Sequence, residues 1–297
     1  MRCHWPVLIL LSAPQLTRGW GDVGHRTVAY LAEQYLDDEG SKLIKDLLLN
    51  NGSDISDAAV WPDTIKWKRP ETRPWHFIDA NHPPKSCGVS YETDCGNGGC
   101  IISALEEMTH KALDLTLDKV SQAESLRFIL HFLGDIHQPL HVEGAYKGGN
   151  GILVHFGRRR SHENLHSVWD TDIPHKINGI AHNIKHNDER EAAKRWAGRL
   201  AQSDLSRSLR GEECTDVSRA VECAMVWARE TNRLNCEFVL KRGVEWLEEN
   251  DLGGNYYDGA VPIVEAQVYK AGVRLAGWLN ALAAERAARG DFVRVDL

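Results

Sequence analysis

Two pairs of histidine and aspartate side chains, together with one further histidine, have the residue types and spacing of a metal site. His131 and Asp135 form the first pair, His166 and Asp170 form the second, and His141 follows the first pair just past a proline. Residues four apart lie on the same face of a helix, and imidazole and carboxylate are ligands that zinc prefers. The pattern therefore predicts a chain that binds several divalent metal ions.

The first pair is expected on a buried helix. A capping box at Ser121 and Glu124 predicts where this helix begins, and Pro139 predicts where it ends. Leucines recur along one face, and Phe128 and Phe132 flank the pair on the opposite face. Burying two ionisable groups without partners is costly, so a bound metal is the expected reason for their position.

Helical periodicity also dominates the rest of the chain. Apolar residues recur at spacings of three and four in residues 28–36, 105–115, 192–200 and 264–282. Pro262 is expected at the first position of the last helix, and only residues 152–156 have the pattern of a strand. No linker or repeat marks a boundary. We expect an all-α fold with long loops, in one domain over residues 20–297.

The start of the chain has the features of a secretory signal. Arg2 is basic, residues 5–13 are apolar, and the small residue Gly19 precedes Trp20, so residues 1–19 are expected to be removed. The apolar stretch is too short to span a bilayer, and no later segment is long enough. Asn51 begins an Asn-Gly-Ser sequon, which is either a glycosylation site or a chance match in a loop.

Cysteine content and charge describe the mature chain further. Six of the seven cysteines remain after residue 19, which predicts three disulfides with fifteen conceivable pairings in an exported protein. The signal holds two basic and no acidic residues, so 33 basic and 42 acidic residues remain, a net charge of −9. A strongly negative surface repels polyanions. Nucleic acid is therefore excluded as a partner unless something else supplies positive charge.

Seven segments carry a resemblance to a known family. They are Trp20-Gly-Asp-Val-Gly-His25, Trp61-Pro-Asp63, Trp75-His-Phe-Ile-Asp79, residues 131–141, Asn164-Leu-His-Ser-Val-Trp-Asp170, Tyr256-Tyr257 and Trp278-Leu279-Asn280. In this order and spacing the chain resembles the trinuclear-zinc, single-strand-specific nucleases, secreted enzymes of fungi and plants that are also 3′-nucleotidases. The resemblance covers nearly the whole mature chain. It implies the mostly helical fold that these nucleases share with zinc phospholipase C.

The resemblance implies three Zn²⁺ ions. One would be held by Asp63, His76, His131 and Asp135. A second would be held by His141, His166 and Asp170. The third would be held by His25, by Asp135 as a bridge, and by the α-amino nitrogen and carbonyl oxygen of Trp20. That amino group exists only if cleavage falls between Gly19 and Trp20.

Three zinc ions would resolve the conflict between an acidic chain and an anionic substrate. Six positive charges would meet only three carboxylates, which leaves the cleft cationic by about +3. Phosphate would then be attracted by the metals rather than by a groove of lysine and arginine. We expect the affinity for nucleic acid to depend less steeply on salt than that of a protein with a basic groove.

The resemblance also implies a reaction. Two bridged zinc ions would lower the pKa of a shared water to supply hydroxide, which attacks phosphorus in line. The second zinc would stabilise the departing 3′-oxygen, leaving a 5′-phosphate. Asp63 and Lys66 would be the catalytic residues, with Lys66 steadying charge on the transition-state phosphate. The alternative for Lys66 is a solvated lysine.

The expected substrates are single-stranded DNA and RNA and 3′-nucleotides, bound by a monomer. The resemblance implies that Phe77 stacks on a nucleobase and that Asp79 binds the edge of that base. Stacking tolerates any base, but the base must first leave its own stack, which disfavours duplexes. The alternative for Phe77 is a core residue. Asn150, after Gly148 and Gly149, is a further substrate-binding candidate, unless this loop is only a turn.

Other histidines and the cysteines receive structural assignments. His137 should point away from the His131 and Asp135 face. No role is expected for His110, His155, His162, His175, His182 and His186. Cys95 and Cys100 could by spacing form a zinc knuckle, but the resemblance implies a disulfide between them. It likewise pairs Cys87 with Cys236, which leaves Cys214 with Cys223.

Two rival functions remain open. A zinc phospholipase C would share the fold, the N-terminal Trp20 and the metal layout, but Phe77 and Asp79 favour a base over a choline headgroup. A secreted zinc-binding protein without catalysis would lack ligands or have a blocked site. All nine expected metal-binding positions are intact, which favours the enzyme.

Overall fold

The computed structural model describes residues 20–49, 53–81, 86–157, 163–180, 186–205 and 214–290. The expected signal, Asn51, His162 and His182 lie outside these residues. Within them the chain is mostly helical and has one sheet of two short strands, which confirms the all-α prediction. None of the described helices combines the length and the apolar character needed to cross a membrane.

The elements before the sheet are short to medium helices. In chain order they are α1 (Asp22–Glu33), α2 (Asp38–Leu47), α3 (Ile55–Ile65), the 3₁₀ helix η2 (Pro70–His76), α4 (Tyr91–Asp94), α5 (Ile101–Leu113), α6 (Lys119–Asp135) and the 3₁₀ helix η3 (Pro139–Val142).

The sheet and the remaining helices follow. They are β1 (Leu153–Val154), β2 (Glu163–Asn164), α7 (Leu165–Ser167), the π-helix η4 (Val168–Asp172), α8 (Ile173–Ile177), α9 (His186–Ala201), the 3₁₀ helix η5 (Val217–Arg219), α11 (Ala220–Leu234), the π-helix η6 (Asn235–Val239), α12 (Val244–Glu249) and α13 (Asn255–Ala288).

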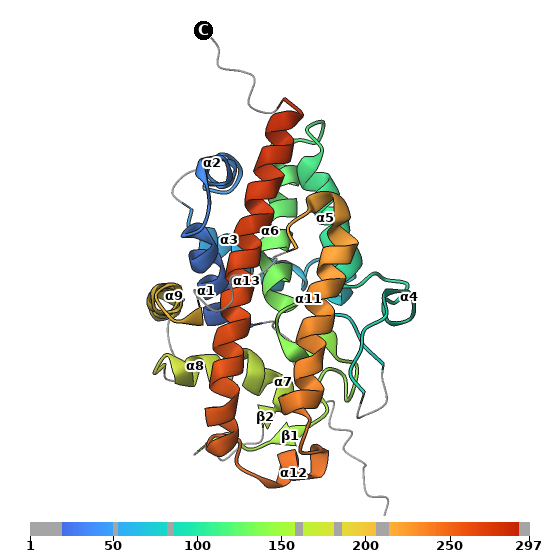
Figure 1. Ribbon diagram of the computed structural model, residues 1–297, viewed down its shortest axis with the longest axis vertical. Helices are drawn as coiled ribbons and strands as arrows, with labels where there is room; N and C mark the ends of the chain where they lie inside the picture. The colour runs from blue at the N-terminus through green and yellow to red at the C-terminus, as the bar shows by residue number, and fades with distance from the viewer. Residues whose placement is uncertain are drawn as a thin grey trace, which may run out of the picture.

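The long helix α13 forms the spine of the molecule. Figure 1 shows it running nearly the full length of the fold, and α1, α2, α5 and α6 pack against it. Its predicted apolar positions are all buried: Val264, Val268, Ala271, Leu275, Trp278 and Leu282. Trp278 meets Trp227 of α11 edge to face, with ring centroids 5.4 Å apart. Burial of this stripe, rather than helix propensity, holds so long a helix in place.

The sequence placed several element boundaries wrongly. Helix α6 begins at Lys119, because the carboxylate of Asp118 accepts hydrogen bonds from the backbone N–H of Val120 and Ser121. The predicted capping residue Ser121 therefore lies inside the first turn, where its hydroxyl donates to Asp118. The helix ends at Asp135, and Pro139 instead opens the next 3₁₀ turn.

The predictions for Pro262 and for the strand were also wrong in part. Pro262 lies inside α13, which begins at Asn255, because packing of its first turns outweighs the local preference of proline. Tyr256 in the first turn is buried, and its hydroxyl accepts a hydrogen bond from the ring N–H of Trp169. Of the predicted residues 152–156, only Leu153 and Val154 form strand β1, which pairs antiparallel with β2.

The three predicted disulfides are present. Cys87 pairs with Cys236, Cys95 with Cys100, and Cys214 with Cys223. This confirms the pairing that the resemblance implied and excludes a zinc knuckle at Cys95 and Cys100. The Cys87–Cys236 disulfide joins residues 149 positions apart and fixes the segment after residue 85 to η6.

Candidate metal centre

The nine predicted metal-binding residues come from separate elements and are all buried. By element they are Trp20 just before α1, His25 in α1, Asp63 in α3, His76 at the end of η2, His131 and Asp135 in α6, His141 in η3, His166 in α7 and Asp170 in η4. Among the described residues, three groups of these side chains could each hold a metal ion: His25, Asp63 and His131; His76, His131 and Asp135; and His141, His166 and Asp170.

The first predicted set meets around one carboxylate oxygen. Oδ2 of Asp135 lies 3.0 Å from Nδ1 of His76 and 3.1 Å from Nε2 of His131. Oδ1 of Asp63 lies 3.5 Å from the same nitrogen of His131 and 3.8 Å from that of His76. The structure thus brings together all four side chains predicted for the first metal.

The second set lies beside the first. Nε2 of His166 is 3.1 Å from Nε2 of His141 and 3.1 Å from Oδ2 of Asp170. The helix that carries His166 is held at its start by Asn164, whose side-chain oxygen accepts the Ser167 N–H at 2.7 Å. Asp170 follows in a π-helical turn, a geometry that is common at functional sites.

The third set uses the other oxygen of Asp135. Nε2 of His25 lies 3.2 Å from Oδ1 of Asp135, and the ring of His25 stacks on that of His131 at 3.8 Å. His25 is also close enough to Asp63 and His131 to share a metal with them. Gly21, next to Trp20, donates its N–H to the carbonyl of Asp170 at 2.8 Å. The start of α1 is therefore fixed beside the centre.

Two glycines make room for this third set. A Cβ at Gly24 would lie 2.6 Å from Cβ of Trp20, and a Cβ at Gly134 would lie 2.7 Å from Nδ1 of His25. Real Cβ atoms do not approach other atoms so closely. Gly134 stands between His131 and Asp135 in sequence, so the missing side chain lets α1 approach α6 at the centre.

Backbone carbonyls orient three of the histidines. Nδ1 of His131 donates to the Ala59 carbonyl at 2.7 Å, Nδ1 of His141 to that of His76 at 2.7 Å, and Nδ1 of His166 to that of Gly148 at 2.6 Å. A carbonyl only accepts, so each Nδ1 carries the hydrogen, and each Nε2 turns its lone pair to the centre. Metal-binding histidines are oriented in the same way.

The resulting donor set fits divalent cations. The Nε2 atoms of His141 and His166 face each other at 3.1 Å, and two lone pairs that meet in this way are satisfied when a metal ion or a proton lies between them. Within the described part of the chain, Asp63 Oδ2, Asp135 Oδ1 and His76 Nε2 are buried without a hydrogen-bond partner. Such unsatisfied buried atoms are rare, and metal ions would account for them.

The pKa values of the metal-free centre separate one histidine that holds a proton from two that stay neutral. Burial lowers the pKa of His131, but Asp135 and Asp63 outweigh it and raise that pKa to about 10. Burial lowers the pKa of His76 to about 4 and that of His141 to about 3. A proton on His131 thus neutralises carboxylates that a metal would otherwise neutralise.

Lys66 is buried beside this centre. Its Nζ lies 2.6 Å from Oδ1 of Asp63, and its side chain is 5% exposed. The alternative of a solvated lysine is therefore wrong. Burial raises the pKa of Asp63, but His131 and Lys66 outweigh it and hold that pKa well below its usual value.

The predicted base-binding residues lie on the segment after His76. Phe77 is half-buried with an extended backbone and does not belong to the hydrophobic core, while Asp79 is exposed. Ile78 between them is buried, and its N–H donates to the carbonyl of His141 at 2.9 Å. The segment that carries Phe77 and Asp79 is therefore joined to the metal centre.

Asn150 lies in a turn, which is the alternative that the sequence left open for this loop. Its side-chain Nδ2 donates to the carbonyl of Lys147 at 2.8 Å. Gly148 and Gly149 have φ values of 60° and 77°, a conformation that favours glycine. This turn also presents the Gly148 carbonyl that accepts His166, so it contributes to the site through its backbone.

One residue that contacts a predicted ligand was not predicted from the sequence. Gln138 is fully buried, its Oε1 accepts the Leu140 N–H at 2.5 Å, and its Nε2 donates to Oδ1 of Asp170 at 2.5 Å. It thereby joins the turn of His141 to Asp170. The signal was present, because Gln138 is a polar residue inside a block of metal-binding positions.

His137 points away from the centre, as expected. Its Nδ1 donates to the Leu133 carbonyl at 2.7 Å, and its Nε2 accepts from Arg274 at 2.9 Å. Arg274 in turn pairs with Glu230, as does Lys270. Burial raises the pKa of Glu230, but hydrogen bonds to these two cations outweigh it and lower that pKa to about 2.

The remaining histidines outside the centre differ in exposure. His110 is exposed, His155 is half-buried and forms an isolated bridge with Asp251, and His175 is buried in α8. His186 begins α9. None of them belongs to the three groups of metal-binding side chains found among the described residues.

Fold and site together define a mostly helical protein with three buried groups of side chains that could hold metal ions. The family model described as S1/P1 Nuclease matches residues 20–284. The chain belongs to the S1/P1 nuclease family.

The chain aligns with individual relatives over nearly their whole length. The chain is 35% identical over 284 residues to "Nuclease S1" of Aspergillus oryzae, which covers 93% of this chain and 96% of that protein. It is 37% identical over 272 residues to "Nuclease P1" of Penicillium citrinum, covering 88% and 97%. It is 32% identical over 291 residues to "Endonuclease 2" of Arabidopsis thaliana, covering 92% and 93%. These matches confirm the resemblance that the sequence motifs indicated.

Proposed function

We propose that the chain is a zinc-dependent endonuclease that hydrolyses single-stranded DNA and RNA to 5′-phosphorylated products and also acts on 3′-nucleotides. The observation that carries this proposal is the buried cluster of nine residues in a member of the S1/P1 nuclease family. The names of the relatives, nucleases and endonucleases, support hydrolysis of phosphoester bonds.

Three zinc ions are the proposed cofactors. Asp63, His76, His131 and Asp135 would hold the first; His141, His166 and Asp170 the second; and Trp20, His25 and Asp135 the third. The two oxygens of Asp135 face different histidines, Oδ2 toward His76 and His131 and Oδ1 toward His25. This division supports a bridging role for Asp135.

The bound metals would supply Lewis-acid chemistry, since they acidify water to yield a nucleophile near neutral pH and neutralise charge on phosphate. The chain itself would position the substrate. Lys66, whose ammonium group is buried against Asp63, would stabilise charge on the transition-state phosphate. A charge kept away from water acts more strongly than an exposed one.

Base recognition is proposed for the segment after His76. Phe77 is partly accessible, so it could stack on a nucleobase, and Asp79 is exposed beside it to accept a hydrogen bond from the base edge. Asn150 would contribute from its turn. Each stacked base would add about 1–3 kcal/mol, while a paired base must first be unstacked at a cost of a few kcal/mol. The difference would favour single strands.

We further propose that the protein is secreted as a monomer beginning at Trp20. Three disulfides among the described residues support an oxidising compartment. Removal of residues 1–19 would free the amino group that the third zinc requires. Asn51 is the proposed glycosylation site.

The test compares four substrates with the mature, zinc-loaded chain: a single-stranded oligonucleotide, its duplex, a 3′-nucleotide and phosphatidylcholine. We expect cleavage of the single strand to 5′-phosphate ends, dephosphorylation of the 3′-nucleotide, slow attack on the duplex and loss of activity after chelation. Hydrolysis of phosphatidylcholine alone would instead identify a zinc phospholipase C. Zinc binding without turnover of any substrate would identify a non-catalytic zinc-binding protein.

A further inference from the structure

A short segment of turns and one 3₁₀ helix carries the chain from one proposed ligand through the next. Residues 136–142 run from the end of α6 at Asp135 through the short 3₁₀ helix η3, which contains His141 and ends at Val142. The two ligands belong to different metal groups. The conformation of this segment therefore fixes the relative position of Asp135 and His141, and would fix that of the metals they hold.

Three carbonyls of this segment receive hydrogen bonds from buried carboxamide side chains. Nε2 of Gln267 donates to His137 O at 2.9 Å, Nδ2 of Asn235 to Pro139 O at 2.7 Å, and Nδ2 of Asn232 to Val142 O at 2.6 Å. We call Asn232, Asn235 and Gln267 the carboxamide frame. Their exposed fractions are 1%, 1% and 2%.

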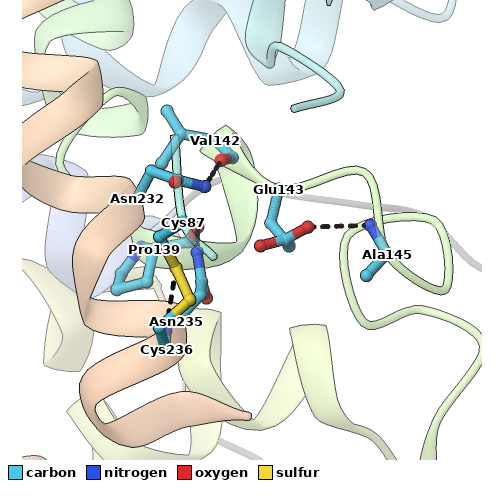
Figure 2. The surroundings of a disulfide bond; sticks show 8 residues. All are labelled: Cys87, Pro139, Val142, Glu143, Ala145, Asn232, Asn235 and Cys236. Carbon is cyan, nitrogen blue, oxygen red and sulfur yellow. Dashed lines mark hydrogen bonds between the residues drawn. A yellow bond between two sulfur atoms is a disulfide. The ribbon is translucent and has the colours of Figure 1, made fainter. Parts of the chain in front are cut away.

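The donors of the frame come from two helices packed around the segment. Asn232 lies in the last turn of α11, Asn235 opens the π-helix η6, and Gln267 lies in α13. Figure 2 shows Asn232 of α11 and Asn235 of η6 pointing toward Val142 and Pro139, beside the Cys87–Cys236 disulfide. The disulfide anchors the residue next to Asn235.

The chemistry of the frame suits a site for cations. A buried carbonyl needs a donor, and lysine or arginine would supply one only by adding positive charge close to the metals. A carboxamide donates without charge. The Oδ1 atoms of Asn232 and Asn235 are themselves buried without a hydrogen-bond partner among the described residues. Such unsatisfied atoms do not add stability, which points to a role of these side chains in the site.

We propose that the carboxamide frame positions the metal centre, because it sets the separation of Asp135 and His141 and hence the spacing of the metals that they hold. Asn232, Asn235 and Gln267 are positioning residues and do not touch metal or substrate. The proposal rests on the proposed zinc-dependent function. It assigns a role to residues outside the ligand set.

The test replaces one donor of the frame at a time. Asn235→Leu keeps the approximate size of the side chain and removes the donor, and Gln267→Met does the same from α13. Asn250→Ala is the control, because Nδ2 of Asn250 also donates to a carbonyl, that of Trp246 at 2.8 Å, but at the C-terminal end of α12, away from residues 136–142. Zinc affinities are measured by competition with a chromophoric chelator, and unfolding is measured separately in the metal-free chain.

We expect Asn235→Leu and Gln267→Met to raise the dissociation constant of one zinc by about 10–100-fold, the usual effect of losing a partner that orients a ligand. The other zinc sites should change less, and Asn250→Ala should leave all zinc affinities unchanged. If Asn235→Leu does not fold, Gln267→Met decides alone.

Variants with unchanged zinc affinities but lower stability of the metal-free chain would overturn the proposal, because the frame would then serve the fold only. Equal weakening of zinc by Asn250→Ala would also overturn it. Failure of the proposed function is a separate result: the unmodified chain would then bind no zinc, or would bind zinc without cleaving single strands.

Discussion

The contact between Gly134 and His25 gives a sharp test of how the third metal site is built. In Gly134→Ala, the new Cβ would lie 2.7 Å from Nδ1 of His25. Ordinary contacts of carbon atoms begin near 3.5 Å, so the ring must move by about 0.8 Å. It cannot move freely, because it is fully buried and stacked on His131 at 3.8 Å.

The effect on stability follows from two opposing terms. Overpacking of this kind costs about 1–3 kcal/mol, while alanine in place of glycine stabilises a helix by about 0.5–1 kcal/mol. Gly198→Ala in α9 is the matched control, since its Cβ would meet no atom within 4 Å. The control gains only the helix term. The two variants should therefore differ by about 1–3 kcal/mol in the free energy of unfolding.

The effect on zinc should be selective. Metal sites tolerate about 0.2 Å in ligand distance, so the displaced His25 should weaken its zinc at least about tenfold, as loss of an orienting contact does. Urea unfolding of the metal-free chains and zinc counts of the loaded chains measure both effects. A Gly134→Ala chain with the full zinc content and the stability of Gly198→Ala would refute this account of the packing.

Three further predictions concern single side chains. Asp135→Ala should remove two zinc ions and Asp170→Ala only one, as measured by metal analysis. Equal losses would contradict the proposed bridging role of Asp135. Lys66→Met should lower kcat on a single strand by about 10²–10³-fold with zinc content intact, and an unchanged kcat would exclude its catalytic role. Glu230 has a folded pKa of about 2, below the value of 4.5 expected when unfolded. Its contribution to stability is therefore complete above about pH 4.5 and lost as the pH falls toward 2. Glu230→Gln should flatten the unfolding free energy over that window, and an unchanged slope would show that this ion pair contributes nothing.

The metal-binding residue types were predictable because their chemistry is local in the sequence. His131 and Asp135 are one helical turn apart, and the proline after them marks a bend before His141. The same periodicity predicted that His137 points away from the pair, and its hydrogen bond to Arg274 bears this out. The prediction was also helped by the presence of two such pairs, because two pairs are harder to explain by chance than one.

Element boundaries were less predictable because several residues can do the same job. Asp118 and Ser121 are both good capping residues, and only the structure shows that the carboxylate of Asp118 accepts the backbone N–H groups. Pro262 is tolerated inside α13 because the turn before it is held by the packing of Tyr256 against Trp169.

The carboxamide frame could not be predicted, because its contacts are remote in sequence. Asn232 lies 90 residues from Val142, Asn235 lies 96 residues from Pro139, and Gln267 lies 130 residues from His137. An asparagine in a helix gives no local sign that it will meet a distant carbonyl. Only the tertiary fold brings these donors to the metal-bearing segment.

The central proposal is that the amino group of Trp20 completes the metal centre. Its most direct test is native mass spectrometry of the secreted chain after removal of any glycan. We expect the mass of a chain that begins at Trp20 and carries three zinc ions, and the loss of all three after chelation. A fully active chain that begins at another residue, or one that carries fewer than three zinc ions, would contradict the account.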